Sequence, residues 1–188
     1  MSTKSAGSLA LAGLVLALAG CAPYSNGGPL GPAMAPALVV CPARFSFEPP
    51  QSVAGWSAPA WPKGFVGMAI DKSHAHCGEH ALRVRVDMNG SLGRSAQLQY
   101  FFEKAQDLSG VTRSVWIYFE TTPPPAVKLQ VVFTDQSLSW VGATAASGFA
   151  AGWNQITGSA TITGASSLIL YFEAPGSAYA GDLWLDDI

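Results

Sequence analysis

Short runs in which apolar and polar residues alternate recur along the chain from about residue 41 onward. The run Ala81–Met88 is the clearest, because Leu82, Val84 and Val86 alternate with charged residues. Side chains of a strand point alternately to the two faces of a sheet, so this period indicates a strand with one buried face. No stretch after residue 41 shows the longer period that is typical of a helix.

Residues that favour turns separate ten such runs. The runs are Arg44–Glu48, Phe65–Ile70, Ala81–Met88, Ser95–Glu103, Val111–Glu120, Val127–Thr134, Leu138–Ala143, Gly152–Thr157, Leu168–Glu173 and Gly181–Ile188. Asn89-Gly90 is a strong turn signal between two of them. Roughly ten strands of ordinary length suit two packed antiparallel sheets, so the sequence predicts an all-β, two-sheet antiparallel β-sandwich.

The last run ends on two adjacent carboxylates, Asp186 and Asp187, in a strand that should be buried. Far upstream, Glu48 is a lone carboxylate on a short apolar run. Charges in a core are costly unless a positive group lies beside them. One interpretation is that the first and last strands lie together and Ca²⁺ neutralises Glu48 with Asp186 or Asp187. The alternative is that these acids are solvated at a strand end.

The first forty residues differ from the rest and are expected to lie outside the fold. Lys4 precedes an apolar run, Leu9–Ala19, that is too short to span a bilayer as a stable helix. Leu18-Ala19-Gly20-Cys21 resembles the lipobox of bacterial lipoproteins, which implies a signal peptide over 1–20 and lipidation of Cys21. An ordinary secretory signal is the alternative.

The lipobox resemblance also implies a location. Ala22 follows the cysteine, where an Asp would favour the inner membrane, so the expectation is a bacterial cell-envelope protein, lipid-anchored, with the outer membrane favoured and the domain extracytoplasmic. Residues 21–40 are rich in Pro, Gly and Ala and form the expected linker. Residues 41–188 have the length of one domain.

Two cysteines, Cys41 and Cys77, could form a disulfide. The chain has three cysteines, and lipidation of Cys21 would leave Cys41 and Cys77 in an oxidising compartment. We predict that these two form a disulfide, the alternative being two free thiols. Charged residues make up only 12% of the chain and the net charge is −2. With no basic run, nucleic acid is not an expected partner.

Several short pieces, in order along the chain, resemble one family. They are Phe47-Glu48, Gly55-Trp56, Cys77-Gly78-Glu79-His80-Ala81-Leu82-Arg83-Val84, Asp107-Leu108-Ser109-Gly110, Gly152-Trp153-Asn154-Gln155-Ile156 and Leu183-Trp184-Leu185-Asp186-Asp187-Ile188. Together they resemble the carbohydrate-binding modules of the galactose-binding-like jelly-roll superfamily, over nearly the whole chain from residue 44. The resemblance implies a jelly roll with a saccharide cleft on one sheet face or at the loop tips.

The resemblance further implies a structural Ca²⁺. Its ligands would be Glu48, backbone oxygens around His76 to Gly78, and Asp186 or Asp187 of the last strand. Cys77 departs from the family pattern, which has a small residue before Gly78. A disulfide between Cys41 and Cys77 would tie the segment before Glu48 to that same loop.

Outward positions of the predicted strands supply the residue types that bind sugars. Aromatic faces stack on pyranose C–H groups, and amides and carboxylates bond the hydroxyls. The candidates are Gln99, Trp116, Tyr118, Gln130, Tyr171 and Glu173, with Trp140 at the rim. The alternative is that this face packs under another layer or is plain surface.

Other chemistry has weaker support. His74, His76 and His80 match no standard zinc spacing. Glu120 and Glu173 are predicted to share the cleft face, as a glycosidase pair would, but no catalytic motif surrounds them. We therefore predict a lipid-anchored module, expected as a monomer, that binds carbohydrate and is not an enzyme. The alternatives are a structural or interaction lipoprotein without a glycan ligand, and a jelly-roll glycoside hydrolase or lyase.

Overall fold

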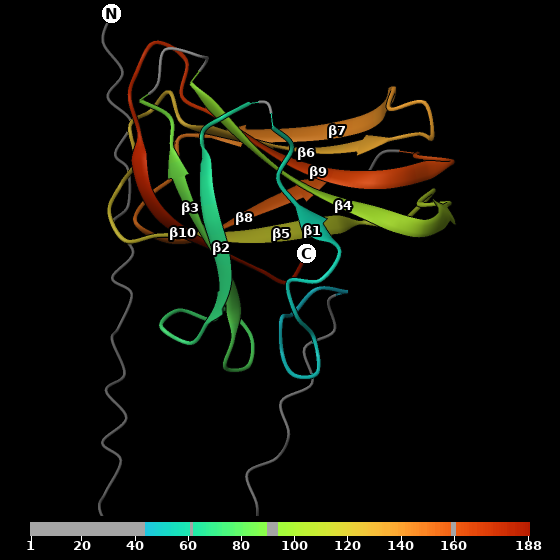
Figure 1. Cartoon of the computed structure of the whole chain (residues 1–188), viewed down its shortest axis with the longest axis horizontal. Coiled ribbons are helices and arrows are strands. Elements are labelled where there is room, and N and C mark those ends of the chain that lie inside the picture. The colour runs from blue at the N-terminus through green and yellow to red at the C-terminus, as the bar shows by residue number, and fades with distance from the viewer. Residues whose placement is uncertain (1–43, 61, 90–93, 159–160) are drawn as a thin grey trace, which may run out of the picture. The chain divides into compact units, whose positions relative to one another are not determined.

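The computed structural model describes residues 44–60, 62–89, 94–158 and 161–188, and within these it contains ten strands and no helix (Figure 1). Sheet A contains, in spatial order, β1 (Trp56–Ser57), β4 (Ser95–Gln106), β9 (Ala165–Glu173), β6 (Lys128–Thr134) and β7 (Trp140–Ser147). Sheet B contains β2 (Phe65–Asp71), β3 (Ala81–Asp87), β10 (Ala180–Asp186), β5 (Arg113–Phe119) and β8 (Gly152–Gly158). All pairings are antiparallel. The predicted two-sheet β-sandwich is confirmed.

The core lies between the two sheets and is built from the apolar half of each alternating run. Leu98, Leu129 and Leu170 line it from sheet A, and Ile117 and Leu185 line it from sheet B; all five are fully buried. Burying such a side chain stabilises the fold by about 1.5–3 kcal/mol. The alternation in the sequence therefore correctly separates inward from outward positions in these strands.

Two predicted strands differ most from the observed elements, and β1 corresponds to no predicted run. Arg44–Glu48 is not a strand, because Phe47 adopts a positive φ of 59° that breaks an extended backbone. The run predicted over Leu138–Ala143 begins at Trp140 and extends to Ser147. Its start is displaced because the Asp135 carboxylate accepts N–H bonds from Ser137 and Ser139, which forms a turn there.

The two ends of the described domain meet, as the sequence suggested. The N–H of Phe45 donates to the carbonyl of Ile188 at 3.1 Å, and the N–H of Ile188 donates to the carbonyl of Phe45 at 3.2 Å. This single pair of backbone bonds places Glu48 near the end of β10. Leu183 and Leu185 of that strand face the core.

The predictions for the N-terminal region concern residues outside those described. They are the signal peptide over 1–20, the linker over 21–40, the lipidation of Cys21 and the disulfide partner Cys41, and all remain predictions. Within the described ranges, no helix has the length and apolar character needed to cross a membrane.

Candidate functional site

The outward-facing residues of β4, β9, β6 and β7 form a surface that we call the sheet A face. Strand pairing places Phe101 opposite Ser167, Ser167 opposite Thr134, and Thr134 opposite Trp140, so these residues form one row across four strands. Phe101 is 52% exposed and Trp140 is 60% exposed. Three strand spacings separate the two aromatic residues by about 14 Å. The row therefore has an open aromatic side chain at each end.

Hydroxyl groups occupy the middle of this row. Oγ of Ser167 and Oγ1 of Thr134 are 2.6 Å apart, and Nε2 of Gln99 donates to Oγ of Ser167 at 3.1 Å. All three residues are buried, although they point away from the core between the sheets. Because buried polar groups with partners are held in place, this network gives the floor of the face a fixed polar pattern.

A second polar row crosses β4 at Gln97, four residues before Phe101. Gln97 lies opposite Tyr171, and Tyr171 lies opposite Gln130. Ile169 and Val132, which are also paired and are buried, form an apolar strip between the two rows. The sheet A face thus alternates between polar rows and an apolar strip, which suits a ligand that has both C–H faces and hydroxyl groups.

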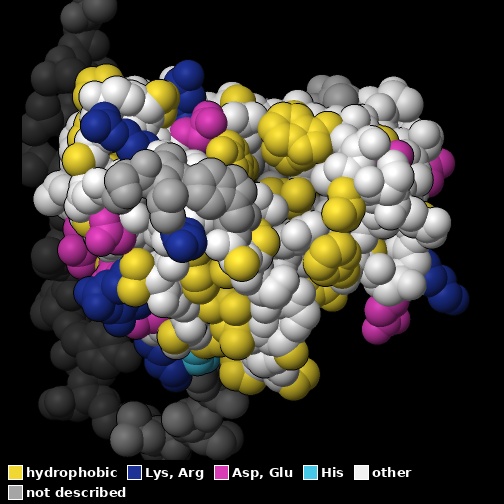
Figure 2. All heavy atoms as spheres, turned by 45° about the horizontal axis from the view of Figure 1, so that its top comes forward, with side chains coloured by type: hydrophobic (Ala, Val, Ile, Leu, Met, Phe, Trp, Pro, Cys, Tyr) yellow, Lys and Arg dark blue, Asp and Glu magenta, His cyan; other side chains and the backbone are white. Residues whose placement is uncertain are grey.

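Charged side chains stand toward the ends of this face rather than in its middle. Glu173 and Lys128 are paired at one end, where Nε2 of Gln130 donates to Oε2 of Glu173 at 2.8 Å. Glu103 lies beyond Phe101 on β4 at the other end. Figure 2 brings the top of Figure 1 forward and shows hydrophobic and uncharged side chains across the middle of that surface. A neutral ligand suits this surface better than an ion.

The outer face of sheet B carries a second set of aromatic residues, and this set is partly covered. Trp184 lies opposite Tyr118 on neighbouring strands. The connection between β2 and β3 folds over them, so that His74 stacks on Tyr118 with 4.1 Å between ring centroids. His76 of the same connection stacks on Trp116 at 3.8 Å. Two imidazoles therefore occupy positions that a stacked sugar would need.

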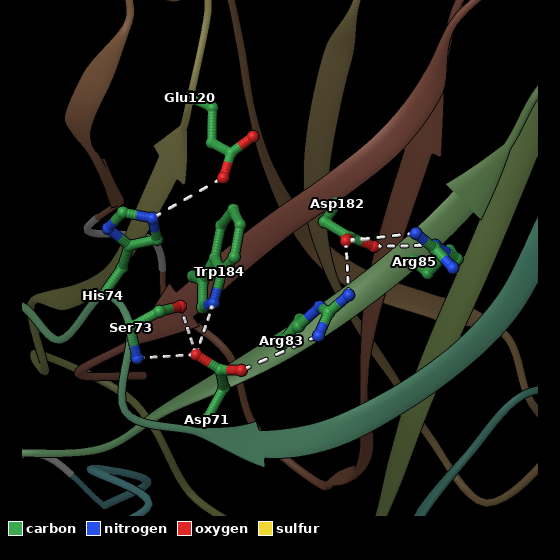
Figure 3. Close-up of polar contacts among 8 residues, drawn as sticks. All are labelled: Asp71, Ser73, His74, Arg83, Arg85, Glu120, Asp182 and Trp184. Atoms are coloured by element: carbon green, nitrogen blue, oxygen red, sulfur yellow. Dashed lines mark hydrogen bonds and ion pairs between the residues drawn. The ribbon is translucent and has the colours of Figure 1, made fainter.

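The charges next to this cluster are paired with one another (Figure 3). Asp182 accepts a hydrogen bond from Nη2 of Arg83 at 2.6 Å. Asp71 lies 3.8 Å from Nη1 of Arg83 and accepts from Nε1 of Trp184 at 3.2 Å. Hydrogen bonding from Ser73, and then from Trp184, lowers the pKa of Asp71. This network joins β2, β3 and β10 and stabilises sheet B.

The predicted metal ligands do come together, around the β2–β3 connection. Glu48 and Asp186 each accept hydrogen bonds from backbone N–H groups of that connection, and Oδ2 of Asp187 lies 2.7 Å from Nδ1 of His76. A Cβ at Gly78 would collide with the Glu48 carboxylate. Burial raises the pKa of Asp186 to about 6. In the described ranges, no group of three or more His, Cys, Asp or Glu side chains is arranged to hold a metal ion.

Solved structures share this fold. No protein-family model matches the sequence, and no curated protein matches it. A carbohydrate-binding module of the β-sandwich superfamily, described as promiscuous in specificity, is 14% identical and has a TM-score of 0.58. The match covers 78% of this chain and 60% of that one. A carbohydrate-binding module specific for non-crystalline cellulose is 15% identical over 76% of this chain and 90% of its own, with a TM-score of 0.57.

This chain has the fold of the β-sandwich carbohydrate-binding modules. An enzyme also contains that fold as a part: an exo-β-agarase matches with a TM-score of 0.55 and 10% identity, over 78% of this chain and 25% of the agarase. At these identities the likeness concerns the fold alone. The residues of the sheet A face must therefore be assessed by their own geometry.

Five predicted sugar-binding residues share the sheet A face: Gln99, Gln130, Trp140, Tyr171 and Glu173. The prediction that Trp116 and Tyr118 join them on neighbouring strands is wrong, because β5 lies in sheet B between β10 and β8. Alternation along a strand shows which residues point outward but not which sheet the strand joins. The binding roles of the five residues stay predictions.

Three residues of the sheet A face were missed by sequence reasoning. Phe101 could have been identified from the sequence as a candidate contact, since it is a large aromatic residue on the otherwise polar side of its strand. Ser167 and Thr134 carry no signal of their own, because serine and threonine are common on any strand surface. Their importance comes from their pairing across β9 and β6.

The predicted carboxylate pair is not formed. Glu120 follows β5 in sheet B, where its Oε1 lies 3.8 Å from Nε2 of His74 (Figure 3). Glu173 lies on β9 in sheet A and is bonded to Gln130. The two carboxylates belong to different sheets, so they cannot flank one glycosidic bond as an acid and base pair would.

Proposed function

We propose that this protein binds carbohydrate without cleaving it, through the sheet A face. The observation that supports this best is the row with exposed Phe101 and Trp140 at its two ends, above a buried floor that Ser167 and Thr134 hold together. Aromatic rings can stack on the C–H faces of sugars, while the partly exposed side chains of Gln97, Gln130 and Tyr171 in the second row can bond their hydroxyl groups. The β-sandwich modules that share this fold are named as carbohydrate-binding proteins.

The ligand we propose is an uncharged polysaccharide or oligosaccharide chain that crosses the strands. The middle of the face holds Gln97, Gln99 and Tyr171 and no charged group among the described residues. The two exposed rings are about 14 Å apart, so a short oligosaccharide can contact both of them. We expect an affinity on the order of micromolar to millimolar, because two exposed rings and a few polar groups supply the contacts.

We also propose that the chain acts at the bacterial cell envelope, held to a membrane by lipid on Cys21, with the outer membrane favoured. This rests on the sequence of residues 1–21, which has the charge, apolar run and lipobox-like tetrapeptide in order. Metabolic labelling with an alkyne fatty acid should mark the wild-type chain and leave Cys21→Ser unmarked.

A polysaccharide panel tests the binding function. Affinity electrophoresis of the purified chain in gels that contain neutral glucans, mannans, xylans or galactans should show retardation by at least one of them. Gels with pectate or alginate should show none beyond that in a polysaccharide-free gel. No retardation in any gel would instead support a structural or interaction role, and release of new reducing ends would support the hydrolase alternative.

A further inference from the structure

The resemblance to carbohydrate-binding modules implies a structural calcium ion between Glu48 and Asp186. The groups around these two carboxylates can be compared with the ligands that calcium needs. Ca²⁺ takes six to eight oxygen ligands at 2.3–2.6 Å. Its ligand oxygens must direct lone pairs at one point. The described residues that bond these two carboxylates present nitrogen donors instead.

Glu48 is bonded by one side of the β2–β3 connection. Its Oε1 accepts the backbone N–H groups of Glu79 at 2.6 Å and His80 at 2.7 Å. Its Oε2 lies 2.9 Å from Nδ1 of His80. Oε1 therefore already has two N–H donors, which is the usual in-plane capacity of a carboxylate oxygen. The pKa of Glu48 is lowered by these hydrogen bonds, against the opposing effect of burial, which is the largest single contribution.

Asp186 is bonded by the other side of the same connection. Its Oδ2 accepts the backbone N–H groups of His76 at 2.8 Å and Cys77 at 3.0 Å, and its Oδ1 accepts the N–H of Asp187 at 2.9 Å. Asp186 has no exposed surface. One neighbouring oxygen, Oδ1 of Asp187, is buried without a hydrogen-bond partner in the described part of the chain. A single oxygen does not make a calcium site.

Gly78 at the centre of the connection explains how one short loop can bond both acids. Its φ of +74° turns the backbone so that the N–H groups before it point to Asp186 and those after it point to Glu48. Successive N–H groups around a residue of positive φ form a concave anion-binding surface. The inner side of this loop thus has the polarity that suits an anion, which is opposite to that of a cation site.

We infer that residues 76–80 form a metal-free clamp, in which backbone N–H groups hold the carboxylates of Glu48 and Asp186 in the place where the family resemblance implies calcium. The clamp joins the segment before β1, the β2–β3 connection and the end of β10. It also fixes His76 on Trp116. The aromatic residues of sheet B consequently stay partly covered, and the exposed aromatic side chains of the described domain are Phe101 and Trp140 of the sheet A face.

Thermal unfolding of the purified full chain tests the clamp. After dialysis against EDTA, Tm should agree within about 1 °C between buffer with EDTA and buffer with 5 mM CaCl2, because a ligand of the folded state alone would raise Tm. Sensitised terbium emission, excited through tryptophan, should show no saturable component. A saturable rise of Tm with calcium, or saturable terbium emission that calcium displaces, would overturn the inference.

A pair of variants separates the clamp from a general loss of negative charge. Glu48→Gln replaces Oε2, the partner of the His80 Nδ1, with an amide NH2 group. We expect Tm to fall by about 5 °C or more, equally with EDTA and with calcium. Glu79→Gln is the matched control, since its exposed side chain lies 3.4 Å from Nζ of exposed Lys72 at the surface; its Tm should match the wild type. A Glu48→Gln chain as stable as the wild type would contradict the clamp, and if that variant does not fold, the two wild-type measurements still decide.

Discussion

The imidazole of His76 lies on the indole of Trp116, with 3.8 Å between ring centroids and 16° between ring planes. The ring face that a sugar would use is therefore occupied by a residue of the same chain. His76 is itself held by its backbone bond to Asp186 and by its side-chain contact with Asp187. Trp116 therefore stabilises the domain through this contact and is not part of the proposed binding face, which belongs to sheet A.

Replacement of Trp116 should affect folding and not binding. We expect Trp116→Ala to lower the free energy of unfolding by about 2–4 kcal/mol, since a half-buried indole and its stacking with His76 are lost. Urea unfolding followed by circular dichroism measures this change. Calorimetric titration with the polysaccharide found in the panel should give the wild-type Kd. A tenfold weaker Kd in a folded Trp116→Ala chain would show that sheet B takes part in binding.

Replacement of the exposed aromatic residues should have the opposite effect. We expect Phe101→Ala and Trp140→Ala each to weaken binding about tenfold, which corresponds to about 1.4 kcal/mol of lost contact. Both side chains are more than half exposed, so the free energy of unfolding should change by less than about 0.5 kcal/mol. Titration calorimetry and urea unfolding measure the two quantities.

The matched control for those variants is Val66→Ala. Val66 is 56% exposed and lies on β2 of sheet B, away from the sheet A face. It should keep both binding and stability. If Val66→Ala weakened binding as much as Trp140→Ala does, the effect could not be assigned to the row of Phe101 and Trp140.

The buried Asp186 makes stability depend on pH. Its pKa is raised by burial to about 6, against an ordinary value of 3.8. The folded state thus holds this proton more tightly than the unfolded chain, and the resulting stabilisation is complete below about pH 4 and is lost as the pH rises through 6. We expect the free energy of unfolding to be greater at pH 5 than at pH 7.5, by about 1–2 kcal/mol.

Urea unfolding across pH 4.5–8 measures that slope. Asp186→Asn cannot ionise, so its stability should be flatter over the same range even though one acceptor is lost. Stability that instead rose with pH between 5 and 7.5 would mean that Asp186 is stabilised in its ionised form, as it would be beside a cation.

The predicted disulfide between Cys41 and Cys77 has its own measurement. Peptide mapping by mass spectrometry without reducing agent should recover the two cysteines in one cross-linked fragment. Reduction should then lower stability by about 3–4 kcal/mol, because the bond closes a loop of some 35 residues in the unfolded chain. Recovery of both as alkylated thiols from the unreduced protein would contradict the pairing.

Local patterns in the sequence determined most of the strands and their inward faces. The run Ala81–Met88 became β3 with Leu82, Val84 and Val86 in the core, because the period of two is a property of each strand alone. The meeting of Glu48 with the end of the chain was also predicted, since unpaired acids in apolar runs need partners. The family resemblance also brought Glu48 and Asp186 to the loop around Gly78, but the sequence did not show that backbone N–H groups of this loop bond both carboxylates.

Only the tertiary structure decided which outward residues share a surface. Trp116 and Tyr171 have the same local pattern, yet β5 pairs within sheet B and β9 within sheet A, so they lie on opposite outer faces. The row from Phe101 to Trp140 likewise arises from the register of four strands that are distant in sequence. Strand pairing and register depend on contacts across the whole chain, and a pattern of period two within one strand carries no information about them.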